Sequence, residues 1–199
     1  SRSGSGWACS SPATRSATRR WSPRRPSPST TSPGGGWSSV TPNASFTQGG
    51  TFSIEFDVDP GINDYDSLSA DWVAIVFGAT ARNAFVNASD GFGILFRNQG
   101  DIQVFDATAA VYGGNGGIEG GLPRGPFHVK IDVSTFGFHG TPATVALFVD
   151  GQPVDINSGP DLTYTKAAGF NGNYITFIGY GSTAGSPWYH AVDNLKVSA

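Results

Sequence analysis

The stretch of the chain between residues 51 and 106 constrains the fold more than any other. It opens with FSIEFDV, residues 52–58, in which every second residue is apolar. The apolar positions are Phe52, Ile54, Phe56 and Val58. This period of two is typical of a strand with one buried face and one wet face. The later run WVAIVF, residues 72–77, is apolar at every position and predicts a strand that is covered on both sides.

Short runs of similar character follow along the rest of the chain. They are rich in Phe, Val and Ile while Leu is scarce, which favours strands over helices. The further predicted strands span residues 91–97, 101–106, 127–133, 143–149, 152–156, 173–181 and 189–198. Asp150 and Gly151 separate two of these runs and form the strongest short hairpin signal in the chain. We therefore predict an all-β protein, built as a two-sheet antiparallel jelly-roll β-sandwich.

Residues 1–36 differ in composition from the rest of the chain. They are rich in Ser, Arg and Pro and contain no Val, Ile, Leu, Phe, Asp or Glu. Such a segment cannot bury enough apolar surface to offset the entropy that ordering it would remove. We predict a low-complexity tail or linker over residues 1–36, either native or introduced with a vector, and one β-sandwich domain over residues 37–199.

The charge of the chain is divided at the same place. Six of the twelve basic residues are arginines in residues 1–36, so residues 37–199 carry six basic and fifteen acidic side chains, a net charge of −9. An acidic body repels nucleic acid and anionic membranes, so neither is an expected partner. No apolar run has the length of a membrane span. Cys9 is the only cysteine, so no intrachain disulfide can form.

Three pairs of segments within residues 40–199 follow one another in an order that is more specific than any single piece. The first pair is FSIEFDV with SADWVAIVFG, the second is PFHVKIDVS with ATVALFVDGQPV, and the third is NYITFIGYGS with AVDNLKVS. This order resembles the concanavalin A-like lectin/glucanase superfamily, in particular its laminin-G-like and legume-type lectin branches. The resemblance implies a concanavalin A-like jelly roll that binds carbohydrate where its loops converge.

The start of the predicted strand at residues 72–77 carries the first candidate ligand groups. SADWVAIVFG resembles the legume-lectin segment in which Ala-Asp-Gly opens a strand and the aspartate hydrogen-bonds sugar hydroxyls, and Asp71 holds that place. Trp72 stands where the family has glycine, and its ring could stack on a sugar. In the alternative interpretation, Asp71 caps the strand and Trp72 fills the core. Trp188 and Tyr189 form the other cluster of large aromatics beside turn residues and complete the ligand-binding candidates.

Three carboxylates at a spacing of two, Glu55, Asp57 and Asp59, supply a catalytic alternative. They share one face of a predicted strand, and a retaining glycoside hydrolase needs two carboxyl groups about 5 Å apart. The segment resembles the Glu-x-Asp-x-x-Glu catalytic run of laminarinase-type glucanases, although its spacing differs and no second Glu follows. The leading interpretation therefore assigns no catalytic residue.

The loop after this strand gathers oxygen ligands at short spacing. Asp59, Asn63, Asp64 and Asp66 suit calcium if the loop folds around the ion. The same residue types also form ordinary turns, so both interpretations stay open. Near the end of the chain, Asp193 falls on the same parity as the apolar residues of its strand. This parity predicts a part-buried carboxylate that accepts backbone N–H groups.

These observations favour a non-catalytic carbohydrate-binding module, lectin-like or laminin-G-like, from a secreted, extracellular bacterial protein. The acidic body favours a neutral poly- or oligosaccharide over uronates and sulfates as the ligand. One alternative is a glycoside hydrolase of the same superfamily that uses Glu55 with Asp57 or Asp59. The other is a structural module for adhesion or fibre assembly. No oligomeric state is predicted.

Overall fold

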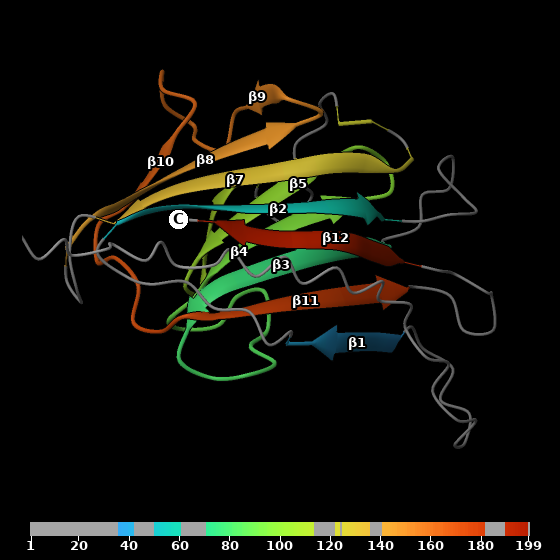
Figure 1. The fold of residues 1–199 in the computed structure, drawn as a ribbon, viewed down its shortest axis with the longest axis horizontal. Helices are drawn as coiled ribbons and strands as arrows, with labels where there is room; N and C mark the ends of the chain where they lie inside the picture. The colour runs from blue at the N-terminus through green and yellow to red at the C-terminus, as the bar shows by residue number, and fades with distance from the viewer. Residues whose placement is uncertain are drawn as a thin grey trace, which may run out of the picture.

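The computed structural model describes residues 36–41, 50–60, 71–113, 122–123, 125–135, 141–181 and 190–198, and its regular elements are all strands (Figure 1). The strands are β1 (Gly36–Val40), β2 (Thr51–Asp59), β3 (Trp72–Ala79), β4 (Phe92–Arg97), β5 (Ile102–Asp106), β6 (Ala109–Tyr112), β7 (Phe127–Thr135), β8 (Ala143–Val149), β9 (Gln152–Val154), β10 (Tyr164–Lys166), β11 (Tyr174–Gly181) and β12 (Ala191–Ser198). Within the described residues there is no helix able to span a membrane.

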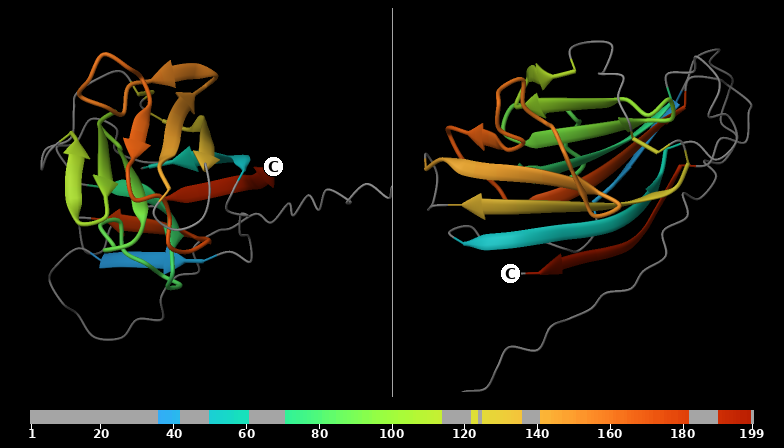
Figure 2. Two further views of the ribbon diagram at one scale, coloured as in Figure 1. Left: turned by 90° about the vertical axis from the view of Figure 1, so that its left-hand side faces the viewer. Right: turned by 90° about the horizontal axis from the view of Figure 1, so that it is seen from above.

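The strands form two antiparallel sheets that lie one over the other (Figures 1 and 2). The β2 sheet has the order β10-β8-β7-β2-β12, with β9 paired to β8. The β3 sheet has the order β1-β11-β3-β4-β5-β6. Strands far apart in the sequence are neighbours in both sheets, as where β12 pairs with β2 and β11 with β3. The predicted all-β, two-sheet antiparallel sandwich is confirmed.

The core between the sheets is built from the inward positions that the period of two predicts. The four apolar residues of β2 are at most 3% exposed. Phe56 of β2 meets Phe177 of β11 edge-on, with ring centroids 5.0 Å apart, and Phe96 of β4 at 6.4 Å. Aromatic rings favour this T-shaped arrangement, which adds to the free energy gained by burying them. Phe56 thus ties the β2 sheet to two strands of the opposite sheet.

β3 is buried along its whole length, as its apolar sequence predicts, because a different layer covers each of its faces. Its inward residues join the main core, and its outward residues join a second apolar cluster. That second cluster consists of Trp72, Ala74, Val76, Ala79, Ala84, Val86, Leu95 and Ile178. Two of its members come from residues 80–91, a segment that folds back over the β3 sheet and that we call the cover loop.

The cover loop rests directly on the sheet, is closed by a contact between its two ends and is tied to Thr41. A methyl group on Gly93 of β4 would lie 2.1 Å from the backbone oxygen of Val86, so only glycine leaves room for the loop. The backbone N–H of Thr80 donates to the Asp90 carboxylate at 2.9 Å, which closes the loop on itself. The backbone N–H of Asn83 donates to the hydroxyl of Thr41 at 2.8 Å, beside β1.

The hairpin predicted at Asp150 and Gly151 is confirmed. Both residues have a positive φ, 48° and 77°, as a two-residue type I′ turn requires. The strand after the turn is shorter than predicted and ends at Val154. The sequence does not predict β1, β6 or β10, because runs of three to five residues are too short to show a period.

A β-bulge in β12 places Asp193 on the outer face of the sheet, contrary to the parity of the sequence. Asp193 lies opposite Asp57 of β2, whose side chain points outward. The register then shifts at Asn194, whose φ of 55° lies in the left-handed region. Leu195 and Val197 pack against the core, so the prediction that Asp193 shares their face is wrong. Its carboxylate accepts a hydrogen bond from the backbone N–H of Asn194 at 2.8 Å.

Asp106 of β5 joins the two sheets at the edge where β10 lies. Its carboxylate accepts a hydrogen bond from the Tyr164 hydroxyl at 2.9 Å and pairs with the ammonium group of Lys166. Lys166 is only 5% exposed, so its charge is buried against one carboxylate. Burial, the hydrogen bond to Asp106 and the negative charge of Asp106 raise the pKa of Tyr164 to about 12. We call these three side chains the Asp106 clasp.

Removal of the clasp carboxylate is expected to destabilise the fold more than loss of an exposed ion pair. Asp106→Ala leaves the Lys166 ammonium buried without its counter-ion, a change that costs about 3–5 kcal/mol of unfolding free energy. Lys196→Met breaks the exposed pair with Glu55 and is expected to cost about 0–1 kcal/mol. Urea unfolding of the two variants measures the difference, and equal losses would contradict a role for the clasp in joining the sheets.

Candidate functional site

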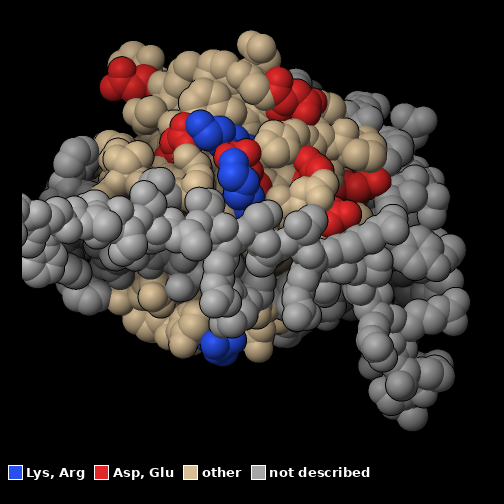
Figure 3. All heavy atoms as spheres, in the orientation of Figure 1, with Lys and Arg blue, Asp and Glu red and all other residues tan. Residues whose placement is uncertain are grey.

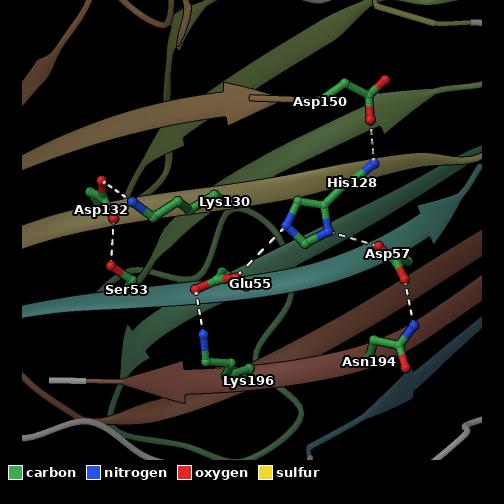
Figure 4. Close-up of polar contacts among 9 residues, drawn as sticks. All are labelled: Ser53, Glu55, Asp57, His128, Lys130, Asp132, Asp150, Asn194 and Lys196. Atoms are coloured by element: carbon green, nitrogen blue, oxygen red, sulfur yellow. Dashed lines mark hydrogen bonds and ion pairs between the residues drawn. The ribbon is translucent and has the colours of Figure 1, made fainter. Parts of the chain in front are cut away.

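The outer face of the β2 sheet carries a network of alternating charges, which we call the charged ladder (Figure 4). Its members are Ser53, Glu55, Asp57, His128, Lys130, Asp132, Asn194 and Lys196. The register of β2 and β7 places Glu55 opposite Lys130 and Asp57 opposite His128. Figure 3 shows basic side chains beside carboxylates near the centre of this face, while other carboxylates stand apart from them. The ladder is therefore a surface of neutralised charge.

Asp57 is held in its ionised form by two neighbours in the ladder. Nδ1 of His128 lies 2.7 Å from one carboxylate oxygen, and the side-chain amide of Asn194 donates to the other. Partial burial raises the pKa of Asp57, but the hydrogen bonds with Asn194 and His128 and the charge of His128 outweigh that effect. The net result is a pKa of Asp57 below its usual value of 3.8.

Glu55 lies between two basic groups of the ladder. The Lys196 ammonium is 3.0 Å from one carboxylate oxygen of Glu55, and Nε2 of His128 is 3.9 Å from the other. A retaining glycoside hydrolase needs one carboxylic acid with a raised pKa beside an ionised carboxylate. The lowered pKa of Asp57 excludes it as the acid and fits the ionised carboxylate of such a pair. The acid role would fall to Glu55, which lies between Lys196 and His128.

Asp59, the third carboxylate of β2, has different surroundings from the other two. It is 7% exposed and lies opposite Ala191 where the strand ends. The other three candidate calcium ligands, Asn63, Asp64 and Asp66, lie outside the described residues. Within the described part of the chain, no group of three His, Cys, Asp or Glu side chains is placed to hold a metal ion. Calcium binding by this loop stays a prediction.

The outer face of the β3 sheet carries three neighbouring aromatic rings, which we call the aromatic row. Trp72 of β3 stacks on Tyr180 of β11, with centroids 5.4 Å apart and 18° between the ring planes. Phe85 of the cover loop meets Trp72 edge-on at 6.2 Å. Trp72 is only 9% exposed, Phe85 is 41% exposed, and Tyr180 is partly exposed. Phe85 and Tyr180 therefore offer most of the row's accessible ring surface.

Polar side chains border the aromatic row on the side of β4. Arg97 lies opposite Trp72 in the register, so Trp72 has Tyr180 on one neighbouring strand and Arg97 on the other. The guanidinium of Arg97 donates to the side-chain oxygen of Gln103 at 3.3 Å. Arg97 is partly buried, and Gln103 is 4% exposed. This arrangement can present a ring face and hydrogen-bond donors to the same ligand.

Asp71 directly precedes the row and is fully buried. Its backbone oxygen accepts a hydrogen bond from the N–H of Asn98, in the turn that joins β4 to β5, at 3.2 Å. Asn98 and Asp101 of this turn are also buried. Asp71 thus fixes the turn that follows Arg97. This geometry matches the interpretation in which Asp71 caps the strand while the ring of Trp72 is packed.

Two groups of site residues remain: residues predicted from the sequence that the structure does not describe, and residues that the structure places in the site but the sequence did not predict. Trp188 and Tyr189 lie outside the described residues. Tyr180 and Arg97 carry a weak signal, because each occupies an outward position near the end of a predicted strand. Phe85 carries none, since its place in the row depends on the cover loop folding back over the sheet.

Comparisons with known proteins agree with this architecture. No protein-family model and no curated protein matches the chain. Among solved structures, the potassium-bound form of the Emp46p carbohydrate recognition domain has a TM-score of 0.51 and 10% identity, over 81% of this chain and 77% of that one. Lectin UEA-II complexed with galactose has a TM-score of 0.49 and 12% identity, over 85% and 84%. At such identities the likeness concerns the fold alone, and the match to the Emp46p domain agrees with the lectin-type β-sandwich expected from the sequence.

The charged ladder predicts a specific acid sensitivity. The pKa of Asp57 is lowered in the folded protein relative to its usual value of 3.8. Asp57 therefore stabilises the fold at any pH above 3.8, and this stabilisation is lost as the pH falls through the lower pKa of the folded state. Asp57→Asn removes this contribution, so the variant is expected to lose less stability than the wild type between neutral pH and about pH 3. Urea unfolding across this range measures the effect. Asp161→Asn, at an exposed aspartate, is the control, and the same change in both variants would contradict the assignment.

Proposed function

We propose that this chain is a non-catalytic carbohydrate-binding module that recognises a neutral glycan on the outer face of its β3 sheet. The observation that carries the proposal is the aromatic row, with the donors of Arg97 and Gln103 beside it. A pyranose ring has an apolar C–H face and a polar rim, so it matches an aromatic surface that is bordered by hydrogen-bonding groups. The ring would lie on Tyr180 and the accessible edge of Trp72, with its hydroxyls toward β4.

The negative charge of the domain favours a polysaccharide that is mainly uncharged as the ligand. Residues 37–199 carry a net charge of −9, which repels a polyanion over its whole length. A neutral polysaccharide meets no such barrier. The fold adds support, since the carbohydrate recognition domain of Emp46p shares it.

Three further residues belong to the proposal through the sequence. Asp71 would act by holding the Asn98 turn and thereby the end of β4. Trp188 and Tyr189, which lie outside the described residues, are proposed as additional aromatic contacts for the glycan. We also propose a secreted, extracellular location, where a polysaccharide ligand would be met.

The module is expected to bind sugars without cleaving them. This expectation is supported by the charged ladder, where Glu55 is paired with Lys196 and the lowered pKa of Asp57 is unsuited to an acid that protonates a leaving group. Incubation with laminarin, lichenan and xylan should release no reducing sugar. Release that disappears in Glu55→Gln would establish the hydrolase alternative in place of this proposal.

A glycan array with and without calcium identifies the ligand, and a ring deletion then locates the site. Tyr180→Ala removes an exposed ring of the aromatic row and is expected to weaken binding roughly 2- to 10-fold. Phe148→Ala is the matched control, because this ring lies on the outer face of the other sheet, beneath Lys130. Isothermal titration with the best array ligand compares the two variants.

Two results of the titration would count against the proposed site. If Phe148→Ala weakens binding and Tyr180→Ala does not, the glycan lies on the β2 sheet. If no glycan on the array binds in either condition, the carbohydrate-binding function itself is wrong, and the structural-module alternative takes its place.

A further inference from the structure

Arg97 is the basic side chain of the site, and none of the ion pairs among the described residues involves it. Within the described part of the chain, its guanidinium contacts the side chain of Gln103, a neutral amide. The ion pairs among the described residues use Lys130, Lys166, Lys196 and His128 instead. This differs from the charged ladder, where each lysine lies against a carboxylate.

A second observation concerns the Nε atom of the same guanidinium. Nε of Arg97 is shielded from solvent and has no hydrogen-bond partner among the described residues. Buried polar groups of native proteins are nearly always hydrogen-bonded, so each exception needs a physical explanation. A guanidinium presents its donors in a planar fork that matches the two oxygens of a carboxylate. Nε itself is shielded, but Arg97 is partly exposed, so a carboxylate ligand would meet the terminal nitrogens of the guanidinium and supply the missing charge.

We infer that Arg97 binds a carboxylate carried by the glycan, so that the recognised ring is a uronic acid within a chain that is otherwise neutral. This inference rests on the proposed carbohydrate-binding function and specifies its ligand. Arg97 and Trp72 are direct partners on neighbouring strands, which lie about 4.8 Å apart. A ring seated over Trp72 and Tyr180 therefore brings a carboxylate on its rim within reach of the guanidinium.

The net negative charge of the domain is compatible with a single carboxylate on the bound glycan. Electrostatic repulsion between exposed groups is screened over a Debye length of about 8 Å at physiological ionic strength. A single carboxylate in contact with Arg97 meets an opposite charge well within that distance. A polyuronate would instead place many charges against a surface with a net charge of −9. The inference thus concerns an isolated uronate and retains the preference for a largely neutral chain.

The test compares sugars that differ only in the carboxylate. Methyl glucuronide and methyl galacturonide are each titrated against the matching neutral methyl glycoside, with ¹H–¹⁵N spectra of the wild-type protein as the readout. Either uronide should bind about 10-fold or more tightly than its neutral partner, as expected for a hydrogen bond to a charged group. The Arg97 Nε–H signal should move only with the uronide. This comparison varies the ligand, so it needs no variant to fold.

Two variants then assign the preference to one side chain. Arg97→Met should make the affinities for the uronide and the neutral glycoside equal, while Arg82→Met should leave the preference intact. Arg82 is the matched control because it lies over the ring of Tyr174, away from Trp72 in the register. Thermal unfolding verifies that both variants are folded.

The outcomes separate this inference from the function on which it rests. Binding of the neutral glycosides without preference for the uronides would overturn the inference alone, as would a preference that survives Arg97→Met. If neither the neutral glycosides nor the uronides bind, the proposed carbohydrate function fails together with the inference.

Discussion

The contact of Phe56 with Phe96 and Phe177 is the interaction on which the rest of the molecule depends. It fixes one strand of the β2 sheet against two strands of the β3 sheet, at ring distances of 5.0 and 6.4 Å. Side chains alternate between the two faces of a strand, so once Phe56 faces inward, Glu55 and Asp57 must face outward. A slip of one residue would bury these carboxylates and expose the phenylalanine. The core thus determines both outer surfaces of the sandwich.

The two outer faces satisfy their charges in different ways, and the functional proposal depends on this difference. On the β2 sheet Glu55 and Asp57 have basic or amide partners on neighbouring strands, and Asp132 pairs with Lys130 of its own strand and with the Ser53 hydroxyl of β2. A ligand there would have to displace contacts that already exist, at a cost in desolvation. On the β3 sheet the guanidinium of Arg97 contacts only Gln103 among its described side-chain partners, next to rings that are partly accessible. A ligand on the second face would have fewer existing contacts among the described side chains to displace.

The sequence predicted what depends on local periodicity, and it failed where contacts are non-local. The alternation of β2, the two-sided burial of β3 and the turn at Asp150 could all be read from neighbouring residues. The bulge at Asn194 could not, because an inserted residue shifts the parity of everything beyond it. The short strands β1, β6 and β10 owe their existence to the strands they pair with. Their own sequences are too brief to indicate them.

The candidate site shows the same division. Trp72 was identified because it opens a strand that resembles a lectin segment. Tyr180 carried only a weak signal, because its strand is far from Trp72 in the sequence, and Phe85 carried none, because it comes from the cover loop. Arg97 was hidden for another reason: a single arginine in a strand becomes informative only when the structure shows what it does and does not contact.

A binding surface made of the aromatic row and Arg97 also requires that the strands and loop carrying these side chains are held rigidly. The cover loop lies in contact with Gly93, is closed by Asp90 and is tied to Thr41 beside β1, so Phe85 is fixed before any ligand arrives. Trp72, Tyr180 and Arg97 stand on paired strands. Groups that are already ordered lose little conformational entropy on binding, which leaves more of the interaction free energy for affinity. If the proposed site binds a glycan, the ring faces would supply contact area that differs little between sugars. Discrimination among ligands would then fall to polar groups beside the rings, and among the described residues we propose the guanidinium of Arg97 for this role.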